Sequence, residues 1–228
     1  KEIYFLEKNF IISKNLIFPH GYSIIGQPGQ KITFENNAKM ISYSQLIFNG
    51  EEDRPIIIET KGRSESSISL INTKGRSIFS NVHFFGSTEP YTPLTGFTGY
   101  FNTYESDIDI FKCLFENNAE EDFLNLIRSN FNISFTNFIN SKSDAIDSDF
   151  SSGSIKSCKF FNLGNDAIDI SGTDLIIENI FIDRAMDKGL SIGEKSHLIG
   201  QNIEISNSNI GIACKDLSKS KLSELNIS

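Results

Sequence analysis

The sequence has no tryptophan, and its 228 residues include only 3 cysteines, 2 methionines and 5 prolines. It also has no apolar run near the roughly 18 residues that a membrane-spanning helix needs, so we expect no membrane span. Acidic residues outnumber basic ones, since there are 29 Asp and Glu and 21 Lys and Arg, which gives a net charge of −8. A chain of this charge without a basic stripe repels phosphate backbones, so we expect no nucleic-acid partner.

The few cysteines predict neither a full disulfide framework nor a zinc site. Cys113, Cys158 and Cys214 are odd in number, so they cannot all pair within the chain. There is no C-x-x-C pair and the three histidines are scattered, which does not match a zinc pattern. We interpret the cysteines as small buried apolar side chains, which leaves the cellular compartment undecided.

A repeat of about 22 residues is the dominant positive feature of the sequence. A series spaced by 22 residues throughout is Leu124, Ile146, Ile168, Leu190 and Ile212. A second series is Phe115, Phe138, Phe160, Ile182, Ile205 and Ile227, followed two positions later by Asn117, Asn140, Asn162, Arg184 and Asn207. A third, spaced by 21 to 23 residues, is Ile110, Ile133, Ile155, Ile176, Ile199 and Leu222. Such a period indicates units that stack on one another.

Each repeat contains short alternations of apolar and polar residues, such as residues 167–170 and 190–192, separated by Asn, Gly, Asp and Ser. A period of two indicates β-strands, and the residues between them favour turns. The sequence therefore predicts an all-β parallel β-helix of roughly nine to ten coils, in which the asparagines form a hydrogen-bonded ladder. A leucine-rich repeat has a similar period, but its L-x-x-L-x-L spacing is absent.

We expect a single domain over residues 1–228, with looser N-terminal coils in residues 1–85 and regular coils in residues 106–228. Ile78 lies 32 residues before Ile110, about ten more than one repeat, and residues 87–105 between them are interpreted as an inserted loop. The last repeat stops six residues after Leu222, which would leave an open β-edge. We therefore expect this end to be covered by further chain or by another subunit.

Two segments carry a family resemblance. Residues 15–58, with "FPHGYSIIGQPGQKITF" and "DRPIII", resemble the first coils of bacterial right-handed β-helix proteins. Residues 165–218, with "NDAIDISGT", "DKGLSIGEKS" and "NIGIACKDLS", resemble the parallel β-helix repeats of the pectin-lyase-like superfamily. The resemblance implies a single-stranded right-handed parallel β-helix and a secreted or cell-surface location. The superfamily contains polysaccharide lyases, glycoside hydrolases, uronan epimerases and non-catalytic surface proteins, so the fold alone does not choose among them.

Aspartates also follow the repeat. Asp122, Asp144 and Asp166 share one position, and Lys188 takes it in the next coil. A second shared position, directed to solvent by the buried isoleucines beside it, contains Asp147 and Asp169. Carboxylates stacked about 4.8 Å apart repel by roughly 1 to 3.5 kcal/mol at surface-like dielectric constants, so a cation, the lysine or a raised pKa should offset the repulsion.

The resemblance gives these aspartates a chemical role. In polyuronate lyases of the superfamily, acidic residues on neighbouring coils hold Ca²⁺ and a nearby basic residue abstracts a proton. By that likeness Lys188 would be the catalytic base, Lys215 or Arg184 would stabilise charge, and calcium would be bound by Asp144, Asp147, Asp166 and Asp169. The lyase, polygalacturonase and epimerase signatures are absent, however. The alternative is that these aspartates only accept backbone hydrogen bonds in turns.

Aromatic residues concentrate in the expected loop. Tyr91, Phe97, Tyr100 and Tyr104 lie there together with Gly and Pro. Aromatic rings on a loop suit stacking against sugars, so these residues are candidates for ligand binding. The alternative is that they pack the loop onto the β-helix.

Two function classes remain open from the sequence. The first is a surface module that binds polysaccharide or serves as a rigid scaffold in a larger chain, and it requires no cofactor. The second is a polysaccharide-modifying enzyme, a lyase or C5-epimerase that acts on an acidic glycan with the help of calcium.

Overall fold

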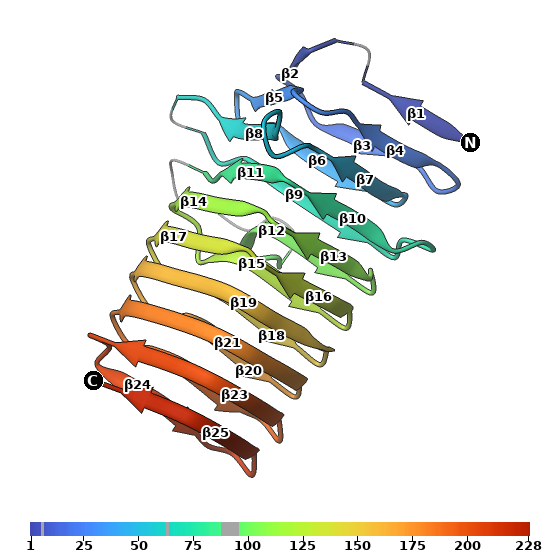
Figure 1. Ribbon diagram of the computed structural model, residues 1–228. Coiled ribbons are helices and arrows are strands. Elements are labelled where there is room, and N and C mark those ends of the chain that lie inside the picture. Colours follow the sequence, from blue (N-terminus) through green and yellow to red (C-terminus); the bar gives the residue numbers. More distant parts are fainter. Residues whose placement is uncertain (6, 63, 88–95) are drawn as a thin grey trace.

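The protein is a parallel β-solenoid of about 10 turns, seen in a computed structural model that describes residues 1–5, 7–62, 64–87 and 96–228. Its strands stack along one axis from the N-terminal to the C-terminal turn, and the pairs are parallel (Figure 1). Within the described residues there is no helix, and so none that is long and apolar enough to cross a membrane. The predicted fold class is confirmed.

Each of the first six turns contributes one strand to each of three columns. The first column consists of β1 (Glu2–Tyr4), β4 (Ser23–Gly26), β7 (Gln45–Asn49), β10 (Ser77–Ser80), β13 (Ile108–Phe111) and β16 (Asn130–Ser134). The second consists of β2 (Asn9–Ile12), β5 (Lys31–Phe34), β8 (Ile56–Thr60), β11 (Val82–Phe85), β14 (Leu114–Asn118) and β17 (Asn137–Ser141).

The third column continues into the later turns as a separate 9-stranded sheet. It consists of β3 (Leu16–Phe18), β6 (Lys39–Ser42), β9 (Ser67–Ile71), β12 (Gly99–Tyr104), β15 (Asp122–Ile127), β18 (Asp144–Asp149), β20 (Ile168–Ser171), β22 (Lys188–Gly193) and β24 (Ile210–Cys214).

In the later turns long strands span the first two columns and join them in one 16-stranded sheet. These strands are β19 (Ser152–Leu163), β21 (Asp174–Ala185), β23 (His197–Ser206) and β25 (Lys219–Ile227). The larger sheet lies across the front of Figure 1, and the smaller sheet lies behind it.

The series spaced by 22 residues forms a column in the core, as predicted. Leu124 pairs with Ile146, Ile146 with Ile168, and the pairing continues through Leu190 to Ile212. The first four are buried, and Ile212 is partly buried against the core. The register between coils therefore follows from which face of each strand is apolar.

The third predicted series was wrong at Ile176 and Ile199, whereas its last member, Leu222, pairs with Gly200 and lies in the inward column. Ile155 pairs with Ile177, and Ile177 pairs with Gly200, so the inward column passes through these residues. Ile176 and Ile199 lie one position away and point outward, with exposures of 50% and 56%. A shift of one residue moves a strand side chain to the opposite face of the sheet.

Phenylalanine rings stack inside the solenoid and account for part of the high content of this residue. In consecutive turns the ring centroids are 4.5, 4.7 and 5.1 Å apart, with nearly parallel planes. The stacked residues are Phe84, Phe115, Phe138 and Phe160. The same column continues in the next turn with Ile182. This buried stack supplies apolar area that stabilises the middle turns.

The predicted asparagine ladder is present at one corner. The Asn140 amide donates to Asn117, and the Asn162 amide donates to Asn140, each at 3.1 Å. These residues have positive φ, a conformation that asparagine tolerates better than most residues. Arg184 takes the next position, also with positive φ, and interrupts the ladder.

A second corner carries a hydroxyl ladder that the sequence interpretation missed. The backbone N–H of one member donates to the hydroxyl of the next, one turn further on, at 3.0 to 3.1 Å. Its members are Thr73, Ser106, Ser129, Ser151, Thr173, Ser196 and Ser218. Their spacing of 22 or 23 residues from Ser106 onward is the signal that would have revealed the ladder.

The expected loop over residues 87–105 is shorter than predicted, because strand β12 occupies its second part. Phe101 pairs with both Ile68 and Leu124 as an ordinary member of the smaller sheet. Phe101 lies 23 residues before Leu124, so the repeat already extended into this segment of the sequence.

Candidate functional site

The candidate site lies on the outward surface of the smaller sheet, over β15, β18, β20 and β22. We call this surface the acidic face. The structure confirms the predicted alignment of its polar residues, since Asp122 pairs with Asp144 in one row. A second row consists of Asn125, Asp147, Asp169 and Ser191.

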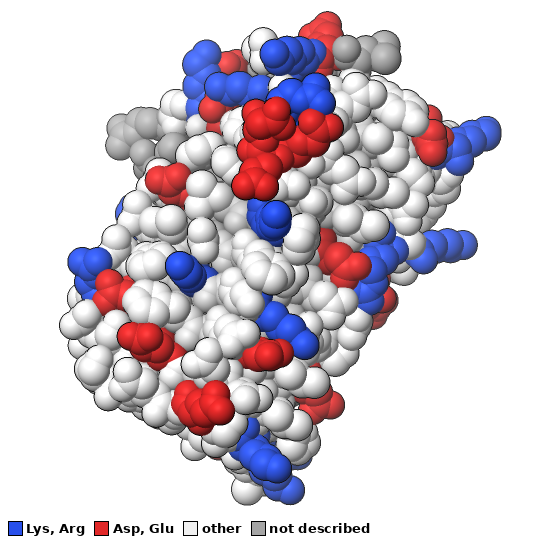
Figure 2. Space-filling view, in the orientation of Figure 1, with Lys and Arg blue, Asp and Glu red and all other residues white. Residues whose placement is uncertain are grey.

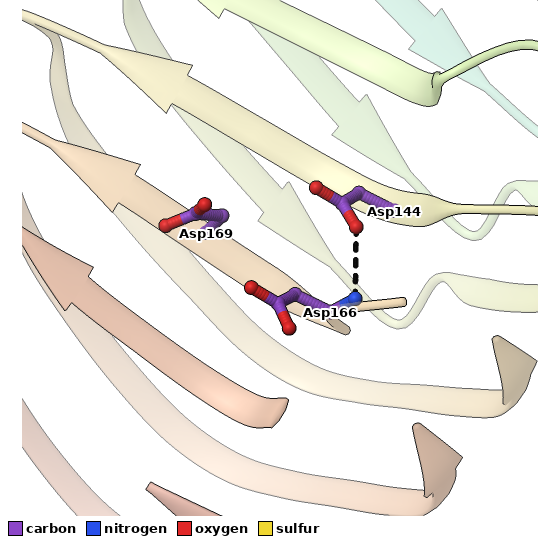
Figure 3. A group of neighbouring side chains, drawn as sticks. All are labelled: Asp144, Asp166 and Asp169. Atoms are coloured by element: carbon purple, nitrogen blue, oxygen red, sulfur yellow. Dashed lines mark hydrogen bonds between the residues drawn. The ribbon is translucent and has the colours of Figure 1, made fainter. Parts of the chain in front are cut away.

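Three aspartates of the acidic face come together, and we call them the aspartate cluster. Asp144, Asp166 and Asp169 each have a carboxylate oxygen within 4.8 Å of the others (Figure 3). Asp144 and Asp166 are buried, and Asp169 is half-buried. The backbone N–H of Asp166 donates to Asp144 Oδ1 at 2.8 Å, which holds that carboxylate against the next turn. The cluster thus unites three of the four predicted metal ligands.

Lys188 stands next to Asp166, one turn further on. Its backbone N–H donates to Asp166 Oδ1 at 2.8 Å, and its ammonium lies 3.4 Å from both Asp166 oxygens and contacts Asp187. These contacts raise the pKa of Lys188, mainly through the Asp187 hydrogen bond and also through the charge of Asp166. A base needs the neutral amine, so the contacts argue against the predicted base and favour a charge-compensating role.

Asp122 and Asp147 form a second acidic group beside the aspartate cluster. The Asn125 amide donates to Asp147 Oδ2 at 3.0 Å and to Asp122 Oδ2 at 3.4 Å. The Thr98 hydroxyl also donates to Asp122. Asp147 was predicted to be a metal ligand, but it is not among the three carboxylates that converge. It is half-buried, and so is less open to solvent than predicted.

Burial makes these carboxyls hold their protons more tightly than usual. It raises the pKa of Asp144 to about 7, with the charge of Asp166 adding to the rise and the Asp166 N–H opposing it. Burial likewise raises the pKa values of Asp122 and Asp147, and the charge of Asp122 raises that of Asp147 further. Burial also raises the pKa of Asp166, against the stabilising effect of Lys188 on its charged form.

The geometry of the aspartate cluster fits a hard divalent cation. Two oxygens on one Ca²⁺, each about 2.3 to 2.6 Å from the ion, lie at most about 5 Å apart. The 4.8 Å limit within the cluster satisfies this condition. Ser191 follows Asp169 in its row and is fully buried, and its hydroxyl has no hydrogen-bond partner among the described residues. A cation with bound water would offer a partner to such a group.

The structure separates the predicted aromatic residues. Tyr100 is fully buried and its ring contacts Phe123, so the prediction that it binds a ligand was wrong. Its burial leaves it no access to a glycan. Phe97 and Tyr104 are partly buried and contact each other, with ring centroids 6.4 Å apart. Tyr91 lies outside the described residues.

Two residues that the sequence interpretation missed extend the aromatic surface. Arg128 lies over the Tyr104 ring, 5.9 Å from its centroid, and donates to the tyrosine hydroxyl at 3.0 Å. One turn further on, Phe150 is 60% exposed. We call Tyr104, Arg128 and Phe150 the corner row. It follows one edge of the acidic face, because these residues lie at or just beyond the ends of β12, β15 and β18.

The other predicted cations make no contact with the aspartate cluster among the described residues. Arg184 pairs with Asp183 at 3.0 Å. Lys215 is exposed and lies close to Gly193, at the C-terminal end of β22. Neither position tests the charge-stabilising role that the resemblance implied.

Comparison with protein-family models gives no match, and comparison with curated proteins gives none either.

Proposed function

We propose that the protein is a secreted or cell-surface module of the pectin-lyase-like superfamily that binds an acidic polysaccharide along the acidic face with the help of calcium. The observation that carries this proposal is the convergence of Asp144, Asp166 and Asp169 within 4.8 Å. A cation held there would neutralise the face and leave coordination positions for carboxylates of a sugar chain.

The corner row supports a polymer as the ligand. Its exposed Phe150 and half-buried Tyr104 lie on different turns of the solenoid, so they are spread along its axis. A sugar chain lying parallel to the axis would meet the cation and the aromatic rings at the same time. Arg128, between the two rings in turn order, would add a donor for sugar carboxylates.

Binding without turnover fits the acidic face better than catalysis by Lys188. The lysine is ion-paired with Asp166 and Asp187, and its raised pKa keeps it protonated. In that state it neutralises the cluster in part and cannot accept a proton from a sugar.

Isothermal titration with oligogalacturonate and oligoalginate tests this function, in calcium and in EDTA. We expect binding in calcium that EDTA abolishes, and a loss of at least about tenfold in Asp169→Asn. Asp169 is chosen because its carboxylate makes no hydrogen bond among the described residues that the substitution would break. Asp174→Asn is the matched control, since Asp174 is an exposed aspartate on the larger sheet. Equal affinity in EDTA would overturn the role of calcium, and absence of binding to both probes would overturn the proposal in favour of a scaffold.

A second candidate function, a lyase or C5-epimerase on an acidic glycan, is favoured by the burial of Asp122 and Asp144. Burial raises the pKa of Asp144 to about 7 and raises that of Asp122 as well. Carboxyls that keep a proton near neutral pH are suited to general acid catalysis. Ultraviolet detection of unsaturated products, and proton NMR of the uronate residues, would detect either reaction. Turnover that is lost in Asp144→Asn would establish this candidate over the first.

A further inference from the structure

A hollow of about 320 Å³ lies on the larger sheet, away from the acidic face. One side is formed by His83, Leu114 and Asn137, which pair on successive turns and point outward from β11, β14 and β17. The other side includes Lys112 and Phe135 at the corner between the first and second columns. We call this the Phe135 hollow. Figure 2 shows the same side of the molecule as Figure 1, where acidic and basic side chains are interspersed among uncharged ones.

Phe135 occupies a position that does not suit it. Its φ is 51°, in the left-handed region, where a bulky side chain is an outlier. The equivalent corner of other turns also has φ between 49° and 55°, and its residues are Asn81, Lys112, Ser157, Asn179, Asn202 and Glu224, none of which is aromatic. The Asn202 amide donates to Asn179 at 2.7 Å, so asparagine also gains a bond there. A phenylalanine at this corner costs backbone strain without providing such a link.

The Phe135 ring is also left in solvent. It is 56% exposed, and its neighbour Phe111 is 40% exposed, with the two rings 5.7 Å apart at 79°. The side chain therefore recovers little of its own hydrophobic burial within the described chain. Strain and exposure at one residue have no benefit for folding, and such residues cluster at binding sites.

The charged groups around the ring cancel, and uncharged polar groups lie beside it. Lys112 lies 3.7 Å from Glu52, and the two charges cancel. The Asn137 side chain makes no hydrogen bond with any described residue. His83 is partly buried, and burial lowers its pKa, so at neutral pH its imidazole offers one donor and one acceptor. Leu114 lies between His83 and Asn137 and is half-buried.

We propose that the Phe135 hollow binds one ring of a neutral hexose polysaccharide, with the sugar face stacked on Phe135 and its hydroxyls bonded to His83 and Asn137. The size of the hollow suits one or two sugar rings and is small for a protein interface. The donors and acceptors of His83 and Asn137 beside an aromatic ring match hydroxyl groups better than they match an apolar peptide. This site is separate from the acidic face and does not depend on calcium.

Titration calorimetry and NMR of the whole chain in EDTA, with cellohexaose, maltohexaose and mannohexaose as probes, test the proposal. We expect at least one of the three to bind, and Phe135→Asn to weaken that binding by about tenfold or more. Because asparagine suits the left-handed corner, the variant should melt at the same temperature as the parent or higher. The loss of binding is then separated from a loss of folding.

Leu217→Asn provides the matched control. Leu217 is also exposed, at 82%, and also has positive φ, at 63°, but it belongs neither to the Phe135 hollow nor to the corner row. This variant should keep the affinity for the neutral probe. The proposal is overturned if none of the three neutral probes binds, or if Phe135→Asn binds the probe as tightly as the parent. Calcium-dependent binding of acidic oligosaccharides is measured separately, so failure at one site is distinguished from failure at the other.

Discussion

Asp144 accepts the backbone N–H of Asp166 at 2.8 Å, so this pair holds one turn of the solenoid to the next. The same contact repeats between Asp166 and the backbone of Lys188, also at 2.8 Å. Asp144 and Asp166 therefore do accept backbone hydrogen bonds, which was the alternative to their role in binding calcium. It coexists with the convergence of the three carboxylates, because a carboxylate has two oxygens and the backbone uses only one.

This arrangement predicts that the protein is more stable in mild acid than at neutral pH when calcium is absent. The pKa of Asp144 is about 7 in the folded state, against about 3.9 for an unfolded aspartate. The folded state therefore binds the proton more tightly, and its advantage is complete below about pH 4 and lost as pH rises through about 7. In that window, each such carboxyl makes the free energy of unfolding fall by up to about 1.4 kcal/mol for each unit by which the pH rises.

Urea unfolding in EDTA at several pH values checks this dependence. Asp144→Asn keeps an acceptor for the Asp166 N–H and removes the titrating carboxyl. The free energy of unfolding of this variant should therefore change less with pH than that of the parent, by an amount that corresponds to up to one bound proton. A parent protein whose stability increases from about pH 4 to about pH 7 would contradict the raised pKa.

The hydroxyl ladder predicts that Thr173→Val costs more stability than Thr173→Ser. Its hydroxyl accepts the Ser151 N–H at 3.1 Å and donates to the Ser148 carbonyl at 2.9 Å. Thr173→Val keeps the shape but leaves a buried N–H without its acceptor, which costs about 1–3 kcal/mol. Thr173→Ser keeps both bonds and should cost less than about 1.5 kcal/mol. Chemical denaturation of the two variants checks this, and equal stability would show that the ladder contributes nothing.

The repeat in the sequence predicted most of the fold, because burial forces residues on successive turns into register. Leu124 and Ile146 could be placed from spacing and alternation alone. The prediction was wrong at Ile176 because Ile177 beside it is equally apolar, and because the inward partner of Ile177 is Gly200. Period and hydrophobicity do not distinguish adjacent isoleucines, and a glycine gives no hydrophobic signal.

The site was less predictable than the fold, because its chemistry depends on distances between side chains. The shared rows of Asp144, Asp166 and Asp169 followed from the repeat. Their carboxylates converge within 4.8 Å, whereas that of Asp147 does not join them. Both facts depend on side-chain directions, which a spacing in the sequence does not give. The pairing of Lys188 with Asp166 was one of the ways expected to offset the repulsion, but its contact with Asp187 was hidden, since Asp187 is adjacent in sequence and gave no sign of a contact.

The stacked rings predict a steep cost for truncating Phe138. Its ring lies 4.7 Å from Phe115 and 5.1 Å from Phe160, and it is fully buried. Phe138→Ala should lower the free energy of unfolding by about 3–5 kcal/mol through lost contacts and a cavity. Phe138→Ile should cost less, because Ile182 fills the same column two turns later. Calorimetric unfolding of both variants checks the order, and a cost below about 1 kcal/mol for alanine would contradict the stack as a source of stability.

The interrupted asparagine ladder predicts a stabilising substitution at Arg184. This residue has a φ of 62°, between Asn162 at 55° and Asn207 at 54° in the same corner. Arg184→Asn would relieve the left-handed backbone and place an amide within reach of the end of the ladder at Asn162. It would lose the ion pair with Asp183, which is worth at most about 1 kcal/mol because the arginine side chain is 57% exposed. We expect a net gain of about 0.5–1 kcal/mol.

Arg184→Gln separates the two contributions, because glutamine also removes the charge but has no comparable preference for positive φ. It should be no more stable than the parent, while Arg184→Asn should exceed both in urea unfolding. Asp183 keeps its bonds to Asn207 and Ser206 in each variant, so the surroundings stay matched. If asparagine gave no advantage over glutamine, the corner ladders would owe their asparagines to something other than backbone conformation and amide stacking.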